Sequence, residues 1–159
     1  MIEYGKKTTA ILGLLFLDVA FHAMLNHAKT SAEAYTYLGV LAIIRILILI
    51  SIFVLVWDTV PFRFGLVGIL CKKMTPLAFT FPVSTLLSFA MALARGSLLS
   101  EGYKQASLWD YGGFQTLFYF DYLGCILFYL ITFFTVFKLS KVKYYQAGDW
   151  IGKASANKR

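Results

Sequence analysis

Residues 38–57 read LGVLAIIRILILISIFVLVW, an apolar stretch that is interrupted by a single charge at Arg45. At ~1.5 Å of rise per residue, a helix of this length crosses the hydrocarbon core of a bilayer, which is about 30 Å thick. Three more apolar runs occupy residues 8–25, 77–94 and 114–137. The sequence therefore predicts an all-α, polytopic membrane protein in which four transmembrane helices form an antiparallel bundle.

The composition of the chain agrees with this class. Of the 159 residues, 59% are hydrophobic and only 14% are charged, and the mean hydropathy is +0.70. The connections between the apolar runs are short, so residues 1–159 are predicted to form one membrane domain. No triad of catalytic residues, phosphate-binding loop or metal-ligand spacing is visible, so the sequence predicts no enzymatic activity.

The basic residues are distributed unevenly between the two sides of the predicted bundle. Eleven of the fifteen lie on the side of the termini: Lys6, Lys7, Arg63, Lys72, Lys73, Lys138, Lys141, Lys143, Lys153, Lys158 and Arg159. Three fall in the opposite connections, namely Lys29, Arg95 and Lys104. The positive-inside rule places both termini in the cytoplasm, or in the matrix if the membrane is mitochondrial. The basic tail at 138–159 fits an anionic leaflet, and nucleic acid is not predicted as a partner.

Three charges interrupt the apolar runs at one depth. Asp18 lies seven residues before the end of the first run, while Arg45 and Asp121 lie seven residues after the start of the second and fourth. A charge at mid-membrane costs roughly 2.5–3.5 kcal/mol on insertion scales, so these side chains are expected to face inward. We predict an Asp–Arg–Asp cluster that fixes helix register. A proton or substrate pathway is the alternative, but no further acids extend it across the membrane.

His22 lies one helical turn from Asp18 and is the other polar side chain of note in the first run. A metal or a haem is one interpretation of such a residue. A single intramembrane His lacks the second axial ligand of a membrane cytochrome, however, and His27 lies outside the run. The sequence therefore predicts no metal and no cofactor, although a structural lipid is compatible with it.

The connection between the second and third runs has an unusual pattern. Pro61 suits the first turn of a helix, and the apolar residues after it are too few to span a membrane. We predict an interfacial helix at 59–73, held at the headgroups by Lys72 and Lys73. The alternative is that the second helix simply extends beyond Trp57.

The third run contains Pro82, which is expected to kink or loosen its first turns. It also carries small residues at four-residue spacing: Thr80, Ser84, Ser88, Ala92 and Gly96. Helices pack closely in lipid where such residues meet, so this stripe is predicted to be a packing face. Its counterpart is either another helix of this chain or a partner protein.

Three stretches resemble the eukaryotic transmembrane protein 138 family over roughly the last 100 residues. The first is Phe64-Gly65-Leu66-Val67 continuing to Lys73; the second is Trp109, Gln115 and Phe118; the third is Tyr145-Gln146, Trp150 and Lys153. The first half of the chain is less similar. Arg45 and Asp121 also depart from the family pattern, which has a polar uncharged residue and an amide at these two positions. The charge cluster is therefore expected to be particular to this chain.

This resemblance implies a non-enzymatic, four-pass protein of the ciliary transition zone. Such a protein is needed for cilium assembly and for delivery of membrane proteins, and it also resides in endomembranes. Its expected partners are other membrane proteins, with the small-residue stripe and the basic tail as docking surfaces. The alternative from the residues is an accessory subunit of a large membrane complex, such as a mitochondrial respiratory assembly. A small transporter would need a polar path across the membrane, which the sequence lacks.

Overall fold

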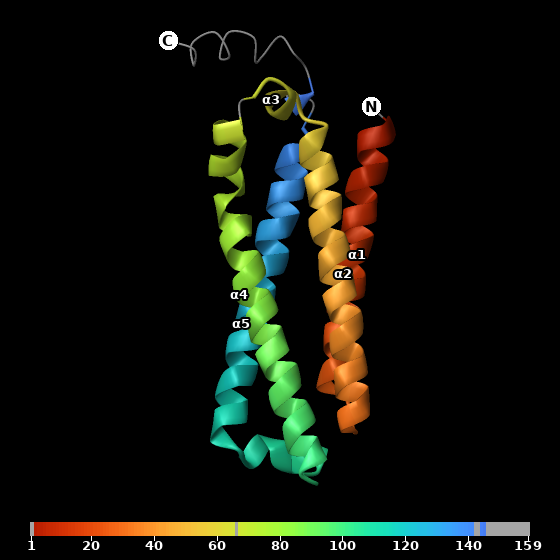
Figure 1. Ribbon diagram of the computed structural model, residues 1–159, viewed down its shortest axis with the longest axis vertical. Helices are drawn as coiled ribbons and strands as arrows, with labels where there is room; N and C mark the ends of the chain where they lie inside the picture. The colour runs from red at the N-terminus through yellow and green to blue at the C-terminus, as the bar shows by residue number, and fades with distance from the viewer. Residues whose placement is uncertain (1, 66, 142–143, 146–159) are drawn as a thin grey trace.

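The computed structural model describes residues 2–65, 67–141 and 144–145. The elements are α1 (Ile2–Asn26), α2 (Ser31–Trp57), α3 (Val60–Arg63), α4 (Val67–Ser100), the 3-10 helix η1 (Gln105–Asp110) and α5 (Gly112–Leu139). Four helices are long and apolar enough to cross a membrane, and the described residues contain no strand. The predicted all-α, polytopic architecture is confirmed. The start of α1, α3 and the end of α5 lie at one end of the bundle (Figure 1).

The helices extend beyond the apolar runs because polar residues continue them. In α2, the Thr30 side chain accepts a hydrogen bond from the Glu33 backbone N–H at 3.2 Å, and the Glu33 carboxylate accepts one from the Thr30 N–H at 3.4 Å. This capping box satisfies amides that would otherwise lack a partner at the helix start. As a result α2 begins at Ser31, seven residues before the predicted boundary at residue 38.

A short helix does lie between the second and third spanning helices, as predicted, but its bounds are not the predicted 59–73. Helix α3 holds only four residues, and Gly65 then adopts φ +72°, a left-handed conformation that favours glycine and ends the helix. From Val67 the chain is already helical, and it continues through Pro76 and Pro82 to Ser100 as a single α4. The alternative, an extension of α2, is also wrong because α2 ends at Trp57.

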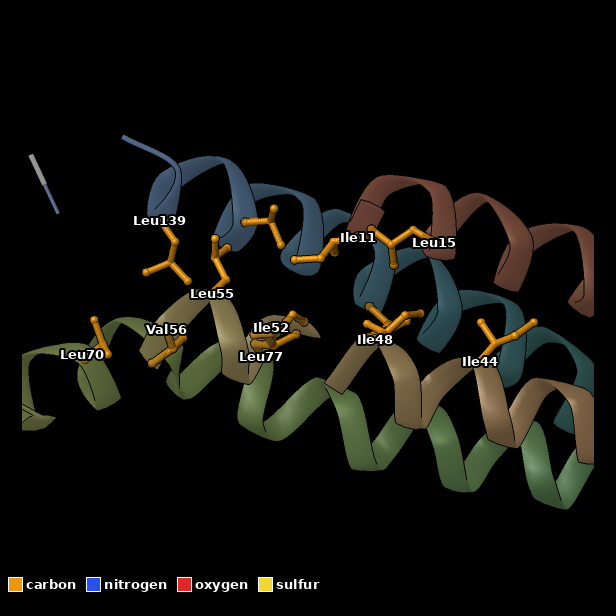
Figure 2. Close-up of a cluster of buried hydrophobic side chains, with 12 residues drawn as sticks. Ile11, Leu15, Ile44, Ile48, Ile52, Leu55, Val56, Leu70, Leu77 and Leu139 are labelled. Atoms are coloured by element: carbon orange, nitrogen blue, oxygen red, sulfur yellow. The ribbon is translucent and has the colours of Figure 1, made fainter. Parts of the chain in front are cut away.

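The apolar core is divided along the bundle axis. One cluster draws on all four long helices, toward the end where α1 begins and α5 ends; the side chains labelled in Figure 2 are Ile11, Leu15, Ile44, Ile48, Ile52, Leu55, Val56, Leu70, Leu77 and Leu139. A second cluster, with Leu25, Leu41 and Ala92, lies toward the opposite end. Arg45 falls between Leu41 and Ile48 in the sequence of α2, so the predicted charge layer is enclosed by apolar packing on both sides.

The small-residue stripe of α4 is turned into the bundle. Ser84, Ser88 and Ala92 are buried and Thr80 is half-buried. A Cβ added at Gly96 would lie 2.6 Å from the Tyr35 ring of α2, which shows that this ring packs directly against the α4 backbone at Gly96. The stripe of α4 thus packs against other helices of this chain, and it does not offer a free surface to a partner.

Candidate functional site

A buried polar layer crosses the middle of the bundle, and Arg45 lies at its centre. Its side chain is 2% exposed, and Nε donates a hydrogen bond to Asp18 Oδ1 at 3.4 Å. Asp18 is fully buried on α1, and its Oδ2 accepts a second hydrogen bond from the Tyr129 hydroxyl at 2.7 Å. The guanidinium also lies 5.6 Å from the centre of the Phe128 ring. The acid and the base therefore compensate each other's burial.

Asp121 belongs to the same layer but contacts Arg45 only through an intermediate. Arg45 Nη2 donates to Ser88 Oγ at 3.0 Å, and the Ser88 hydroxyl donates to Asp121 Oδ1 at 2.7 Å. The close ionic neighbour of Asp121 is His22, whose Nε2 lies 3.1 Å from Asp121 Oδ2. The structure thus brings together all three residues predicted from depth, as two linked pairs instead of one triplet.

Four residues of this layer are not among the predicted charges: His22, Ser88, Cys125 and Tyr129. His22 follows Asp18 by four residues and Cys125 follows Asp121 by four, a spacing that places each pair on one helix face. The Cys125 sulfur lies 3.8 Å from His22 Nε2 and accepts a hydrogen bond from Arg45 Nη2 at 3.6 Å. A search for polar residues four positions from each acid would have found both.

The formal charges of the layer leave one negative charge to be balanced. Arg45 compensates Asp18, so Asp121 needs a positive charge nearby because an uncompensated buried carboxylate is costly. His22 can supply that charge as an imidazolium, and a bound cation can supply it instead. Among the described residues, Asp121 Oδ2, His22 Nδ1 and Arg45 Nη1 have no hydrogen-bond partner.

The layer connects to the opposite end of the bundle through aromatic rings. His22 packs edge-on against Tyr122, with the ring centres 5.8 Å apart, and Tyr122 contacts Phe118 at 4.5 Å. Phe118 in turn contacts Trp109 of η1 at 4.8 Å. The Gln115 side-chain amide donates to the Trp109 carbonyl, so three family-like residues hold η1 against α5.

The other family-like residues that the structure describes lie at the end of the bundle where α1 begins and α5 ends. Phe64 is exposed and Gly65 forms the turn before α4, in which Val67 is the first residue and Lys73 the seventh. Tyr145 is half-buried just beyond α5. Leu66, Gln146, Trp150 and Lys153 lie outside the described residues.

Arg95 is placed differently from the sequence prediction. It was assigned to the third connection, but α4 continues to Ser100 and buries its side chain to 2% exposure. The guanidinium lies 5.3 Å from the centre of the Phe114 ring. The third connection is therefore shorter than predicted, and it contributes one basic residue fewer to that side of the membrane.

The sequence matches a known family over most of its length. The family model described as Transmembrane protein 138 matches residues 35–154, which include Arg45, Ser88, Asp121 and Cys125. Asp18 and His22, on α1, precede the matched segment. No curated protein and no solved structure matches the chain significantly.

Proposed function

Since this chain belongs to the transmembrane protein 138 family, we propose that it is a non-enzymatic membrane scaffold of the ciliary transition zone. Its role there is to support cilium assembly and the delivery of membrane proteins. The observation that carries this proposal is the family match over residues 35–154, which takes in three of the four long helices.

The surface of the bundle supports a scaffold role. Many large apolar side chains point outward from the long helices, among them Phe16 at 74% exposure and Phe134 at 65%. Such faces suit lipid tails and the apolar helices of other membrane proteins. The ionic groups of the membrane interior are directed toward one another, so they hold the helices in register in this proposal and carry no substrate.

The charge distribution supports an orientation with both termini in the cytoplasm. Arg63 and Lys72 are exposed at the end of the bundle where α1 begins and α5 ends, and Lys7 of α1 pairs with Asp58 just beyond α2. Basic residues at the cytoplasmic end interact with anionic headgroups, each contributing ~1 kcal/mol. Anionic lipids of that leaflet are therefore proposed as partners, together with other membrane proteins.

Localisation and rescue test the proposal. The tagged full-length chain is expressed in ciliated cells from which the endogenous family member has been deleted. We expect the tag at the base of the cilium and restoration of ciliation. A mitochondrial signal, with co-purification of respiratory subunits, would replace this proposal with the accessory-subunit alternative.

A matched pair of variants separates a scaffold from a transporter. Arg45→Leu is expected to lower both protein level and rescue, because it leaves Asp18 buried without its partner. Arg45→Leu combined with Asp18→Asn removes both charges, so a scaffold should regain both level and rescue. If the double variant regains its level but not rescue, the polar layer has an activity of its own and the scaffold role is wrong.

A further inference from the structure

Three different metal-ligating side chains converge inside the bundle. His22 comes from α1, while Asp121 and Cys125 occupy successive turns of α5. All three are buried, and one ligand atom of each lies within 4.8 Å of the other two. From this geometry we propose that His22, Asp121 and Cys125 bind one zinc ion in the membrane interior.

The separations match one face of a tetrahedral site. Metal–ligand bonds of ~2.0–2.3 Å place two ligands of a tetrahedral zinc ion about 3.3–3.6 Å apart. His22 Nε2 lies 3.1 Å from Asp121 Oδ2 and 3.8 Å from Cys125 Sγ, and the His22 nitrogen, the Cys125 sulfur and one carboxylate oxygen of Asp121 lie within 4.8 Å of one another. Small side-chain rotations therefore suffice to bring the three donors to bonding distance of one ion.

The surroundings of Asp121 Oδ2 are consistent with the same ligand. Asp121 is fully buried, and its Oδ2 accepts no hydrogen bond of good geometry from the described residues. The neighbour of this oxygen is His22 Nε2, 3.1 Å away, which forms an ion pair with it only when the imidazole is protonated. A buried carboxylate oxygen is normally satisfied, and a cation held between this oxygen and the imidazole nitrogen would satisfy it.

Neighbouring residues are placed to orient the ligands. The Ser88 hydroxyl donates to Asp121 Oδ1, which leaves Oδ2 for the ion. Arg45 Nη2 donates to the Cys125 sulfur, a contact that stabilises a thiolate. Hydrogen bonds from neighbouring residues to the metal ligands fix the orientation of those ligands in known metal sites. With three protein ligands, the fourth position is filled by water or by an exogenous ligand.

The charges of the layer are balanced by a divalent ion. Zinc brings two positive charges, which the Asp121 carboxylate and a Cys125 thiolate neutralise, while Arg45 remains neutralised by Asp18. In the absence of the ion, one proton shared between His22 and Asp121 keeps this pair neutral. Zinc entry thus releases two protons, this one and that of the Cys125 thiol. The layer is neutral in both states, as the membrane interior requires.

The donor set selects the metal. Calcium and magnesium prefer sites made entirely of oxygen, whereas nitrogen, sulfur and one carboxylate oxygen suit zinc. The site differs from a structural zinc finger in having three protein ligands and in lacking a described partner for His22 Nδ1. When the second ring nitrogen of a metal-binding histidine lacks a hydrogen-bond partner, metal affinity falls by about 10–100-fold. We therefore expect a moderate affinity for zinc.

The experiment measures zinc in the purified full-length protein. The chain is extracted in detergent without chelators, loaded with Zn²⁺, freed of excess metal and subjected to elemental analysis. We expect about one zinc per chain for the wild type and at least about a ten-fold loss for His22→Gln and for Cys125→Ser. His27→Gln and Cys71→Ser are matched controls, since both of these residues are exposed and should not alter the content.

Two further readouts keep the result independent of folding defects. Cobalt-loaded wild type should show a thiolate-to-cobalt charge-transfer band that persists in Cys71→Ser and disappears in Cys125→Ser. A chelator should lower the unfolding temperature of the wild type but not of Cys125→Ser. If the variants of His22 or Cys125 aggregate, Asp121→Asn replaces them, because an amide keeps the side-chain shape but is a poor zinc ligand.

The proposal that these three residues form a metal site is overturned by two results. One is a monodisperse wild-type protein that stays free of zinc after loading. The other is a zinc content that Cys125→Ser and Asp121→Asn leave unchanged, which would assign the metal to exposed groups. Stoichiometric copper in place of zinc would also reject the assignment.

Discussion

Arg45 is a long cationic side chain buried at the centre of an apolar bundle, and its direct ionic contact is with Asp18. Removing one member of a buried pair is more damaging than removing both, because the remaining charge stays in a low-dielectric environment. The geometry also specifies which acid depends on Arg45. Asp18 is within 3.4 Å of it, whereas Asp121 is reached only through Ser88 and has His22 beside it.

We predict that Arg45→Leu lowers the free energy of unfolding by about 3 kcal/mol. Adding Asp18→Asn should restore most of this loss, because no buried charge then lacks its partner. Adding Asp121→Asn instead should restore little. The measurement is reversible unfolding in mixed micelles, followed by circular dichroism.

Arg63→Leu is the control for this series. Arg63 is largely exposed and lies 3.9 Å from Asp58, so its loss should cost less than about 1 kcal/mol. Equal recovery by Asp18→Asn and Asp121→Asn would show that the two acids share Arg45. The pairing described here would then be wrong.

The depth of these charges could be predicted from the sequence, but their pairing could not. A constant rise per residue fixes how deep Asp18, Arg45 and Asp121 lie once the ends of the apolar runs are known. The rotation of each helix about its axis depends on packing, so the sequence does not reveal that Asp121 faces His22. For the same reason Cys125 was not recognised as a neighbour of His22, although both lie four residues from an acid.

At the level of helices, close approach of α4 and α5 depends on small residues on both. A Cβ added at Gly124 of α5 would lie 2.9 Å from Leu87 Cδ1 and 3.8 Å from the Ser84 Cα of α4. The stripe of α4 thus meets a small residue of its neighbour, as helix packing in lipid requires. A larger side chain at Gly124 must displace the Leu87 side chain and then meets the backbone of α4 at Ser84.

We predict that Gly124→Leu lowers the free energy of unfolding by about 1–3 kcal/mol, the usual cost of overpacking. Gly39→Leu is the matched control, because it makes the same change within α2 at a position with no atom within 4 Å of an added Cβ. Unfolding in mixed micelles measures both. A loss of equal size in the two variants would attribute the effect to side-chain size alone and not to the α4–α5 contact.

The connection between α4 and α5 is held by Trp109, whose ring contacts Phe114 and Phe118. Each aromatic pair contributes about 0.5–1.5 kcal/mol beyond its buried area. We predict that Trp109→Ala speeds hydrogen exchange in η1 by roughly ten-fold or more, as expected for a loss of about 1.4 kcal/mol. Tyr103→Ala, in the same connection, is the control and should leave exchange in η1 unchanged. Unaltered protection in Trp109→Ala would contradict this role.

The number and type of the spanning helices followed from apolar run length, but their boundaries did not. The runs ended where polar residues began, whereas hydrogen bonding carries α4 from Val67 to Ser100 and places Arg95 inside it. The predicted bounds 59–73 of the short helix were wrong because Gly65, with its left-handed backbone, lies between the end of α3 and the start of α4. The helix boundaries therefore depend on local backbone geometry, which hydropathy alone does not predict.

At the scale of the whole molecule, an even number of spans places the start of α1 and the end of α5 on one side of the membrane (Figure 1). The same end contains α3 with the exposed Arg63, whereas the exposed Lys29 lies between α1 and α2 at the opposite end. The two sites therefore report opposite faces of the membrane. Arg95 is buried within α4 and does not belong to a connection. The difference in the number of basic residues between the two faces is therefore larger than the sequence alone predicted.

We predict that a membrane-impermeant maleimide, added to sealed vesicles with their cytoplasmic face outward, labels Arg63→Cys but not Lys29→Cys. Both substitutions are made together with Cys71→Ser, because Cys71 is exposed, while Cys125 is buried and can be retained. The physical reason is the excess of basic residues on the side of the termini, which resists translocation. Detergent should expose Lys29→Cys to the reagent, and this step controls for reactivity. Labelling of Lys29→Cys in sealed vesicles, with protection of Arg63→Cys, would invert the topology and place the basic end away from the anionic leaflet.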